Sequence, residues 1–325
     1  MNILITGGAG YIGSHVVKQL GENTLHSLKI LDNLSTGKAE AVLYGNLIRE
    51  DLSNTKKVEE IIEKGNFDAV IHFSASITVP ESIENPMKYY LNNTANTINL
   101  VNLCIKHKIK NFIFSSTAAV YGETDNTPVK ESVPLNPINP YGMSKLMSEK
   151  VIIDAGKSHP DFKYVILRYF NVSGADINNK IGQSFPNATN LIKVAAETAA
   201  GKRGKIYIFG EDYSTNDGTA IRDYIHVEDL ANAHIKALDY LKTNRSNIFN
   251  CGYGTGYSVK EVVNTMRKVS GINFKTETTL RRLGDPEIVI ADNSKIKTEM
   301  GWFPKYNDIE LICKTAYSWE KFKNY

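Results

Sequence analysis

The amino terminus contains a glycine motif that strongly restricts how this chain folds. Gly7, Gly10 and Gly13 follow the apolar run 2–6, and Gly13 lies at the start of a run with helical apolar spacing, residues 12–20. Glycines at this spacing let the backbone turn tightly from a strand into a helix and approach a pyrophosphate, which the helix N-terminus attracts. Asp32 ends the second apolar run, at the distance where a carboxylate binds an adenosine ribose. The order predicts a dinucleotide site; the alternative is a glycine-rich turn without a ligand.

The first half of the chain alternates apolar runs with amphipathic ones. This alternation predicts an α/β fold in which a doubly wound, Rossmann-type parallel sheet is covered by helices on both faces. Ligands bind such sheets at the carboxyl ends of the strands. The expected strands and helices are residues 69–73, 111–115, 164–168 and 247–250, and residues 54–63, 92–107, 141–158 and 227–242.

The texture changes near residue 171, where glycines, asparagines and short elements begin to dominate. We therefore expect two domains. The dinucleotide-binding domain comprises residues 1–170 plus about 222–250. A smaller C-terminal α/β substrate domain comprises about 171–221 plus 251–325.

Composition excludes several classes of function. The 325 residues include 38 basic and 35 acidic ones, so nothing favours nucleic acid or a membrane surface as a partner. No apolar stretch is long enough for a bilayer, and the N-terminal apolar run is too short for a signal peptide. Three scattered cysteines indicate reduced thiols and a cytoplasmic protein without a disulfide framework. His72 and His226 lack partners at metal spacing, so we expect structural roles and no metal.

Tyr141 and Lys145 are the strongest candidates for chemistry. At i and i+4 they share one face of a helix, and an ammonium near a phenol lowers the pKa of the tyrosine. Such a tyrosine can take a proton from a sugar hydroxyl. The spacing alone is weak, with about one chance match expected in a chain of this length. Its weight comes from its position, in a helix that follows a proline-rich loop and the strand ending in Ser115, Ser116 and Thr117.

Several longer motifs together carry a resemblance that covers nearly the whole chain. The sequence resembles the extended short-chain dehydrogenase/reductase family and, within it, the UDP-glucose 4-epimerases. The motifs are TGGAGYIGSH from Thr6, LDNLSTGK from Leu31, HFSA from His72, FSSTAAVYG from Phe114, NPYGMSK from Asn139, LRYFNVSGAD from Leu167 and FGEDYSTNDGTAIRDYIHVEDLANAH from Phe209.

The resemblance implies a role for each matching residue. Thr117 would hydrogen-bond the sugar hydroxyl, Tyr141 would be the catalytic base and acid, and Lys145 would hold the nicotinamide ribose. The cofactor would be NAD, bound by Gly7, Gly10, Tyr11, Ile12, Gly13, Asp32, Asn33, Asp51, Leu52, Phe73, Ser74, Ala75, Asn92, Ser115, Tyr141, Lys145 and Tyr169. The substrate, a UDP-sugar, would be bound by Thr117, Asn171, Asn190, Leu191, Tyr207, Phe209, Arg222, Arg282, Asp285 and Val289.

The residues also support part of this substrate set independently, because arginine forks suit the pyrophosphate of a nucleotide sugar. Arg222 and Arg282 lie in segments flanked by Gly and Asp, although an ordinary surface or interdomain ion pair is the alternative for each. Val289 would line the sugar pocket; the alternative is a plain strand residue. We also expect a homodimer formed through residues 92–107 and 141–158.

The implied reaction is epimerisation at carbon 4 of a UDP-hexose by transient oxidation to a 4-keto sugar. The implied substrates are UDP-glucose and UDP-galactose, and the N-acetyl forms are a further candidate. Alternatives are a UDP-glucuronate epimerase or decarboxylase and a non-catalytic dinucleotide sensor, although sensors typically lack the tyrosine or lysine. Dehydratases of this fold carry Asp-Glu after the threonine, where this chain has Ala118 and Ala119. One departure is Ile77, where many bacterial members carry a lysine.

Overall fold

The computed structural model describes residues 1–22, 25–124, 127–185, 188–282 and 285–323. It divides into two compact units, which we describe separately. The first unit comprises Met1–Gly122, Pro134–Arg168 and Ala231–Phe249, and the second comprises Glu123–Val133, Tyr169–Leu230 and Asn250–Tyr325. Residues 123–133, 169–170, 222–230 and 250 therefore group with the second unit, although the sequence pattern placed them in the first domain. The domain boundaries themselves stay a prediction.

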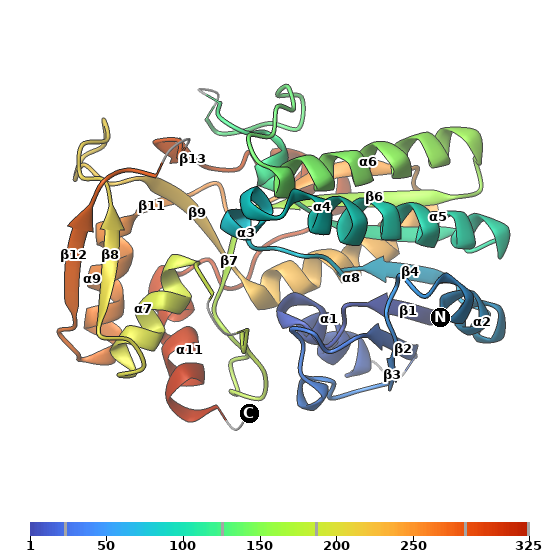
Figure 1. Cartoon of the computed structure of the whole chain (residues 1–325), viewed down its shortest axis with the longest axis horizontal. Helices are drawn as coiled ribbons and strands as arrows, with labels where there is room; N and C mark the ends of the chain where they lie inside the picture. The colour runs from blue at the N-terminus through green and yellow to red at the C-terminus, as the bar shows by residue number, and fades with distance from the viewer. Residues whose placement is uncertain (23–24, 125–126, 186–187, 283–284, 324–325) are drawn as a thin grey trace. The chain divides into compact units, whose positions relative to one another are not determined.

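The first unit is built on a seven-stranded sheet with the order β10-β6-β5-β4-β1-β2-β3 (Figure 1). Neighbouring strands from β5 through β4, β1 and β2 to β3 pair in parallel. The expected doubly wound α/β fold is confirmed. The strands are β1 (Asn2–Thr6), β2 (Ser27–Asp32), β3 (Asn46–Arg49), β4 (Ala69–His72), β5 (Asn111–Thr117), β6 (Lys163–Tyr169) and β10 (Asn247–Cys251).

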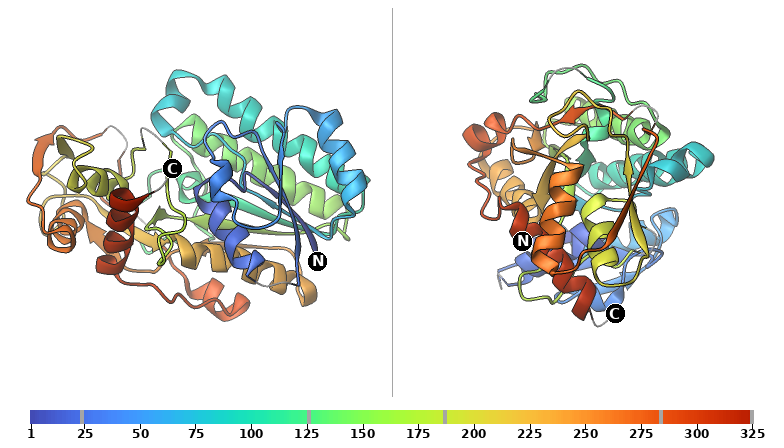
Figure 2. Two further views of the ribbon diagram at one scale, coloured as in Figure 1. Left: turned by 90° about the horizontal axis from the view of Figure 1, so that it is seen from below. Right: turned by 90° about the vertical axis from the view of Figure 1, so that its left-hand side faces the viewer.

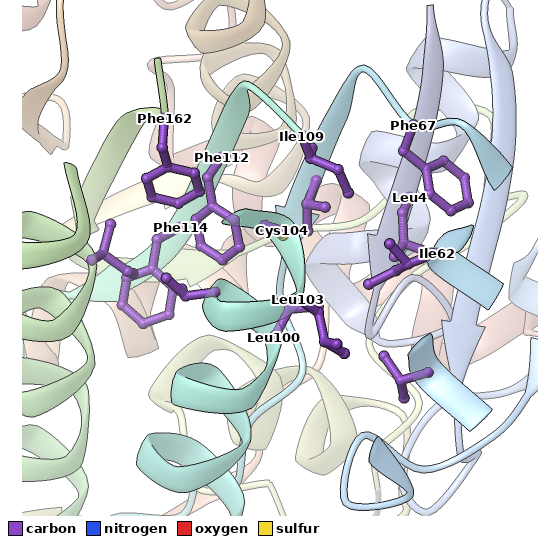
Figure 3. Close-up of a cluster of buried hydrophobic side chains, with 14 of the residues drawn as sticks. Leu4, Ile62, Phe67, Leu100, Leu103, Cys104, Ile109, Phe112, Phe114 and Phe162 are labelled. Atoms are coloured by element: carbon purple, nitrogen blue, oxygen red, sulfur yellow. The ribbon is translucent and has the colours of Figure 1, made fainter. Parts of the chain in front are cut away.

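Side chains that alternate along β1 explain why helices cover both faces of this sheet. Leu4 belongs to a buried cluster with Phe112 and Phe114 of β5, against helices α2, α5 and α6 (Figure 3). Ile5 points to the opposite face, where it lies with Val17 of α1 around Gly8. The left view of Figure 2 shows both helical layers, with the cyan and green helices on one side of the strands and α1 and α8 on the other.

Asparagine side chains cap three helices of the first unit, α2, α4 and α6. In α6, Pro140 occupies the first turn and the Asn139 side chain accepts a hydrogen bond from the Gly142 N–H, as helix starts favour. The helices are α1 (Tyr11–Gly21), α2 (Thr55–Gly65), α3 (Val79–Glu84), α4 (Pro86–Tyr89), α5 (Asn96–Lys106), α6 (Pro140–Ser158) and α8 (Val227–Thr243), with 3-10 turns at Ala39–Ala41 and Ala118–Val120.

One expected helix boundary was wrong. Residues 92–95, expected as the first turn of an α-helix, lie in a π-helical turn, Tyr90–Ala95, and α5 begins only at Asn96. The wider turn directs the side chains of Asn92 and Asn93 to the loop after β4, which they bind. Apolar periodicity does not distinguish the two kinds of turn, and π-helical turns are often found at functional sites.

The second unit is organised around β9. This strand pairs in parallel with β7 and β13 and antiparallel with β11, while β8 and β12 form a separate two-stranded sheet. The strands are β7 (Asn171–Ser173), β8 (Lys205–Phe209), β9 (Ile221–His226), β11 (Gly256–Ser258), β12 (Lys275–Thr279) and β13 (Ile288–Val289). The helices are α7 (Leu191–Ala199), α9 (Val259–Ser270), α10 (Ser294–Met300) and α11 (Ile309–Phe322).

Candidate functional site

The glycine loop between β1 and α1 requires glycine at the positions that the motif supplies. Gly7 has a φ of +73°, and a Cβ there would lie 2.6 Å from the Ser74 backbone nitrogen. A Cβ on Gly13 would collide with the Gly7 carbonyl oxygen. Gly10, the N-cap of α1, provides no side chain to cap the first N–H groups, and the first turn carries no acidic residue. Tyr11 and Ile12 lie in this turn. The loop therefore fits a pyrophosphate, whose oxygens these N–H groups can bind.

Asp32 closes the other side of this loop. Its buried carboxylate accepts hydrogen bonds from the Ala9 N–H at 2.9 Å and the Leu34 N–H at 2.9 Å. Burial raises the pKa of Asp32, and the two N–H bonds oppose that shift. The Asn33 amide donates to Asp51 at 2.5 Å, so the side chains that would bind the adenosine lie together. Leu52, which follows Asp51, is buried.

The backbone after β4 runs directly past the glycine loop. The Phe73 N–H donates to the Thr6 carbonyl, and Ser74 is the residue that a Cβ on Gly7 would strike. Phe73, Ser74 and Ala75 are half-buried. Asn92 donates to the Ser76 hydroxyl at 3.0 Å. These residues lie where the expected dinucleotide path leaves the loop.

Thr117 and Tyr141 are hydrogen-bonded in the first unit, and Lys145 lies one helical turn further along α6. Burial raises the pKa of Tyr141, whereas the hydrogen bond with Thr117 lowers it. The expected lowering of the Tyr141 pKa by Lys145 stays a prediction. The Lys145 ammonium donates to the Ser115 carbonyl at 2.9 Å and lies 4.8 Å from the centre of the Phe114 ring.

Both histidines singled out in the sequence are held by hydroxyl or backbone groups. The ring nitrogens of His72 contact the Thr6 and Thr97 hydroxyls at 2.7 and 2.9 Å, and burial lowers its pKa to about 3. His226 contacts the Thr315 hydroxyl and accepts the Glu228 N–H. In the part of the chain described, no group of three or more His, Cys, Asp or Glu side chains is arranged to hold a metal ion.

Arg222, Asp285 and Val289 come together in the second unit. The Arg222 guanidinium donates to the Asp285 carboxylate at 2.5 Å and to the Pro286 carbonyl at 2.6 Å. Val289 is half-buried and pairs with Arg222 across β13 and β9. The ion-pair alternative for Arg222 is thus realised in this state, yet its partner is another expected substrate residue.

The other expected substrate residues of the second unit form two further groups. The Arg282 guanidinium lies 3.9 Å from the centre of the Phe209 ring, and the Tyr207 ring lies beside Phe209. The Asn190 amide, at the start of α7, binds Gln183 and the Val172 carbonyl, and Leu191 follows it. The Asn171 amide donates to the Asp223 carbonyl. Tyr169, expected at the cofactor, also belongs to the second unit.

Comparison with known proteins identifies the family. The profile of the NAD dependent epimerase/dehydratase family matches residues 3–252. The chain belongs to this family.

Similar proteins align over almost all of the chain. A UDP-glucose 4-epimerase from Azospirillum brasilense is 46% identical over 98% of this chain and 92% of its own length. The UDP-Glc/GlcNAc 4-epimerase structure from Campylobacter jejuni is 56% identical, with a TM-score of 0.88, and covers 98% of this chain and 99% of its own. The Brucella ovis UDP-glucose 4-epimerase structure in complex with NAD is 40% identical, with a TM-score of 0.95, and covers 98% of each chain.

Sequence reasoning missed two buried polar residues that hold the site. The Asn93 amide accepts the Ser76 N–H at 2.7 Å and donates to the Ser76 carbonyl and the Ser144 hydroxyl, so it ties the loop after β4 to α6. Asp223 accepts N–H bonds from residues 253, 254 and 291, and burial raises its pKa to about 6. The sequence does contain a signal for Asn93, because Asn92 and Asn93 form a pair of polar residues in an amphipathic run. Asp223 had none, because its partners are distant in sequence.

Two further sequence expectations concern the environment of the protein. Cys104, Cys251 and Cys313 are free and buried. Among the described ranges, the structure contains no helix whose length and apolar character would let it cross a membrane.

Proposed function

We propose that this protein catalyses the NAD-dependent interconversion of UDP-hexoses that differ at carbon 4, with UDP-glucose and UDP-galactose as substrates. The observation that carries the proposal is the hydrogen bond between Thr117 and Tyr141, with Lys145 buried one turn away, on the unit that holds the glycine loop. The Azospirillum brasilense and Brucella ovis relatives, both named UDP-glucose 4-epimerase, support it.

The chain's own residues divide the work of this reaction. Tyr141 takes the proton from the hydroxyl on carbon 4, and Thr117 orients that hydroxyl. The glycine loop and Asp32 would hold NAD, which would supply the hydride acceptor and donor for carbon 4. Arg222 and Arg282 grip the uridine diphosphate, so that binding energy from the non-reacting part holds the substrate while the keto-sugar turns. Tyr141 then returns its proton to the new hydroxyl.

The residues around Thr117 weigh against the alternatives. Thr117 leads directly into the turn Ala118–Val120, so a dehydratase would lack its acid and base there. A non-catalytic sensor would not need Tyr141 and Lys145 buried together. A UDP-glucuronate epimerase or decarboxylase would use the same catalytic residues, so only the substrate that is turned over distinguishes these activities from the proposed one.

Product analysis with a panel of UDP-sugars tests the proposal. We expect purified protein to interconvert UDP-glucose and UDP-galactose in both directions without net NADH formation, as followed by NMR of the sugar signals. Selective turnover of UDP-glucuronate, with or without loss of carbon dioxide, would establish the alternative activity. Binding of NAD without turnover of any UDP-sugar would establish a sensor.

The cofactor preference follows from Asp32. Its carboxylate is fixed by two N–H groups, and a phosphate on the adenosine ribose would meet this negative charge. We expect NAD to bind at least about 100-fold more tightly than NADP, which corresponds to about 2.7 kcal/mol. Calorimetric titration of both nucleotides measures the difference. Asp32→Asn should narrow it, and equal affinities in the parent protein would contradict the assignment.

We also propose that the protein is a homodimer formed through α4, α5, α6 and the π-helical turn. These neighbouring elements expose large apolar side chains, which a partner surface would cover. Those side chains are Met87 (60% exposed), Leu91 (66%), Ile98 (45%) and Met147 (40%).

Light scattering tests the dimer. We expect twice the chain mass at micromolar concentration, and the monomer mass for Ile98→Asp, because dimerisation would bury the new charge. Leu25→Asp is the matched control, since Leu25 is 78% exposed and lies outside this surface. A monomeric parent protein, or equal effects of the two variants, would refute the proposal.

The buried free cysteines suit a reducing compartment, and we propose a cytoplasmic location.

A further inference from the structure

Glu149 extends the spacing of the two catalytic candidates along α6. Tyr141, Lys145 and Glu149 are separated by four residues each, so they share one face of the helix. All three are buried, and the Glu149 side chain is completely so. A buried carboxylate one turn beyond a buried lysine is costly unless something holds it.

Each of the last three residues of β5 binds one of these three residues of α6. Successive strand residues each use a different group, so this face of α6 is fixed against the strand at three points. The contacts are the Lys145 ammonium donating to the Ser115 carbonyl at 2.9 Å, the Ser116 hydroxyl donating to the Glu149 carboxylate at 2.5 Å, and the hydrogen bond between Thr117 and Tyr141.

Arg168, near the end of β6, holds the Glu149 carboxylate from the other side. Its guanidinium donates through Nε and Nη2 to both carboxylate oxygens, at 2.6 to 3.1 Å, and through Nη1 to the Tyr121 hydroxyl at 3.0 Å. The side chains of Arg168 and Glu149 are 3% and 0% exposed. Apolar residues in place of such a buried pair are often equally stable, so stability alone does not explain the charges.

The groups that face Lys145 indicate how the Glu149 carboxylate affects it. From its own helix Lys145 faces Glu149, from β4 it faces His72, and from β5 it faces the Phe114 ring. His72 is neutral, because its pKa is about 3. Burial lowers the pKa of Lys145 to about 7, and the negative charge of Glu149 opposes this shift.

We propose that Glu149, fixed by Arg168 and Ser116, is a positioning residue that keeps Lys145 in its charged form one turn from Tyr141. This role rests on the proposed function, in which the Lys145 ammonium favours the Tyr141 phenolate. Since a lysine is charged below its pKa, losing the Glu149 charge lowers that pKa further and shrinks the charged fraction from the alkaline side.

Glu149→Gln tests the proposal, because glutamine keeps the size and the acceptor for Ser116 but removes the charge. We expect the titration midpoint of Lys145 to fall by about one unit, as for loss of a nearby opposite charge. Carbon-13 NMR of ε-labelled lysines in the purified protein measures it, with the signal assigned by its absence in Lys145→Met. This readout does not depend on turnover, so it is independent of the proposed function.

The pH profile of kcat provides the second readout. If the midpoint moves from about 7 to about 6, kcat should fall about twofold at pH 6, about fivefold at pH 7 and about ninefold at pH 8, following the charged fraction. A purely structural role would lower kcat by the same factor at every pH. An unchanged Lys145 midpoint, or a pH-independent loss of kcat, overturns the proposal.

Two further variants separate the charge from the packing. Ser116→Ala removes one contact to Glu149 but keeps its charge, so the Lys145 midpoint should stay within about 0.3 units of the parent. Glu149→Gln with Arg168→Met removes both members of the buried ion pair, so Arg168 is not left unpaired, and this guards against misfolding. Its Lys145 midpoint should also fall. A parental midpoint in the double variant, or a fall in Ser116→Ala equal to that in Glu149→Gln, contradicts the role of the carboxylate.

Discussion

Tyr141→Phe should lower the rate of epimerisation by at least about 100-fold, because it removes the group that carries the proton to and from the sugar. The ring itself is kept, including its edge-on contact with Tyr89, whose ring centre lies 6.4 Å away. NAD binding and thermal stability should therefore change little. Steady-state turnover of UDP-galactose, calorimetric titration with NAD and thermal unfolding measure the three quantities.

Tyr89→Phe is a matched control for this experiment. Tyr89 is fully buried, and its hydroxyl binds Thr78 and Glu81 instead of Thr117. Loss of this hydroxyl should affect stability more than turnover, because the Thr78 N–H, the Thr78 carbonyl and the Glu81 carboxylate each lose a partner. Near-native turnover by Tyr141→Phe would mean that another group is the base. Equal losses of turnover in the two variants would assign the effect to packing.

The second large effect concerns the sugar that the site accepts. Val289 is several heavy atoms smaller than a tyrosine, so a sugar pocket lined by Val289 would leave room for an N-acetyl group on carbon 2. We expect the protein to epimerise UDP-N-acetylglucosamine as well as UDP-glucose. The Campylobacter jejuni relative, named a UDP-Glc/GlcNAc 4-epimerase, supports this range. Val289→Tyr should lower the N-acetyl activity by about 100-fold and spare the plain hexose.

Ile288, the neighbour of Val289 in β13, provides the control. Val289 pairs with Arg222 across β13 and β9, and Ile288 pairs with Ile221, so the two side chains point to opposite faces. Ile288→Tyr should not discriminate between the two sugars. The gate lies elsewhere if the parent protein ignores the N-acetyl sugar, or if Val289→Tyr harms both activities equally. Measuring kcat/KM for both substrates in all three proteins decides the question.

The sequence by itself determined the elements whose signal is local. Fully buried parallel strands are continuous apolar runs, so β1, β4 and β5 were visible without the structure. The glycine loop was visible because only glycine tolerates the φ of Gly7 and the approach of Ser74. The pair Tyr141 and Lys145 was visible because helical periodicity places both on one face. Each signal depends on residues close together in the chain.

The tertiary structure alone decided where polar groups from distant segments meet. The residues of β3 are half-buried or exposed, so they form no apolar run in the sequence. They form a strand because they pair with β2. Asn93, in the π-helical turn Tyr90–Ala95, accepts the N–H of Ser76, which lies 17 residues earlier in the chain. Arg168 meets Glu149 across 19 residues, and Asp223 meets the Ala291 N–H across 68. A lone acid or arginine in a sequence reads as surface charge, and only burial against a specific partner converts it into part of a site.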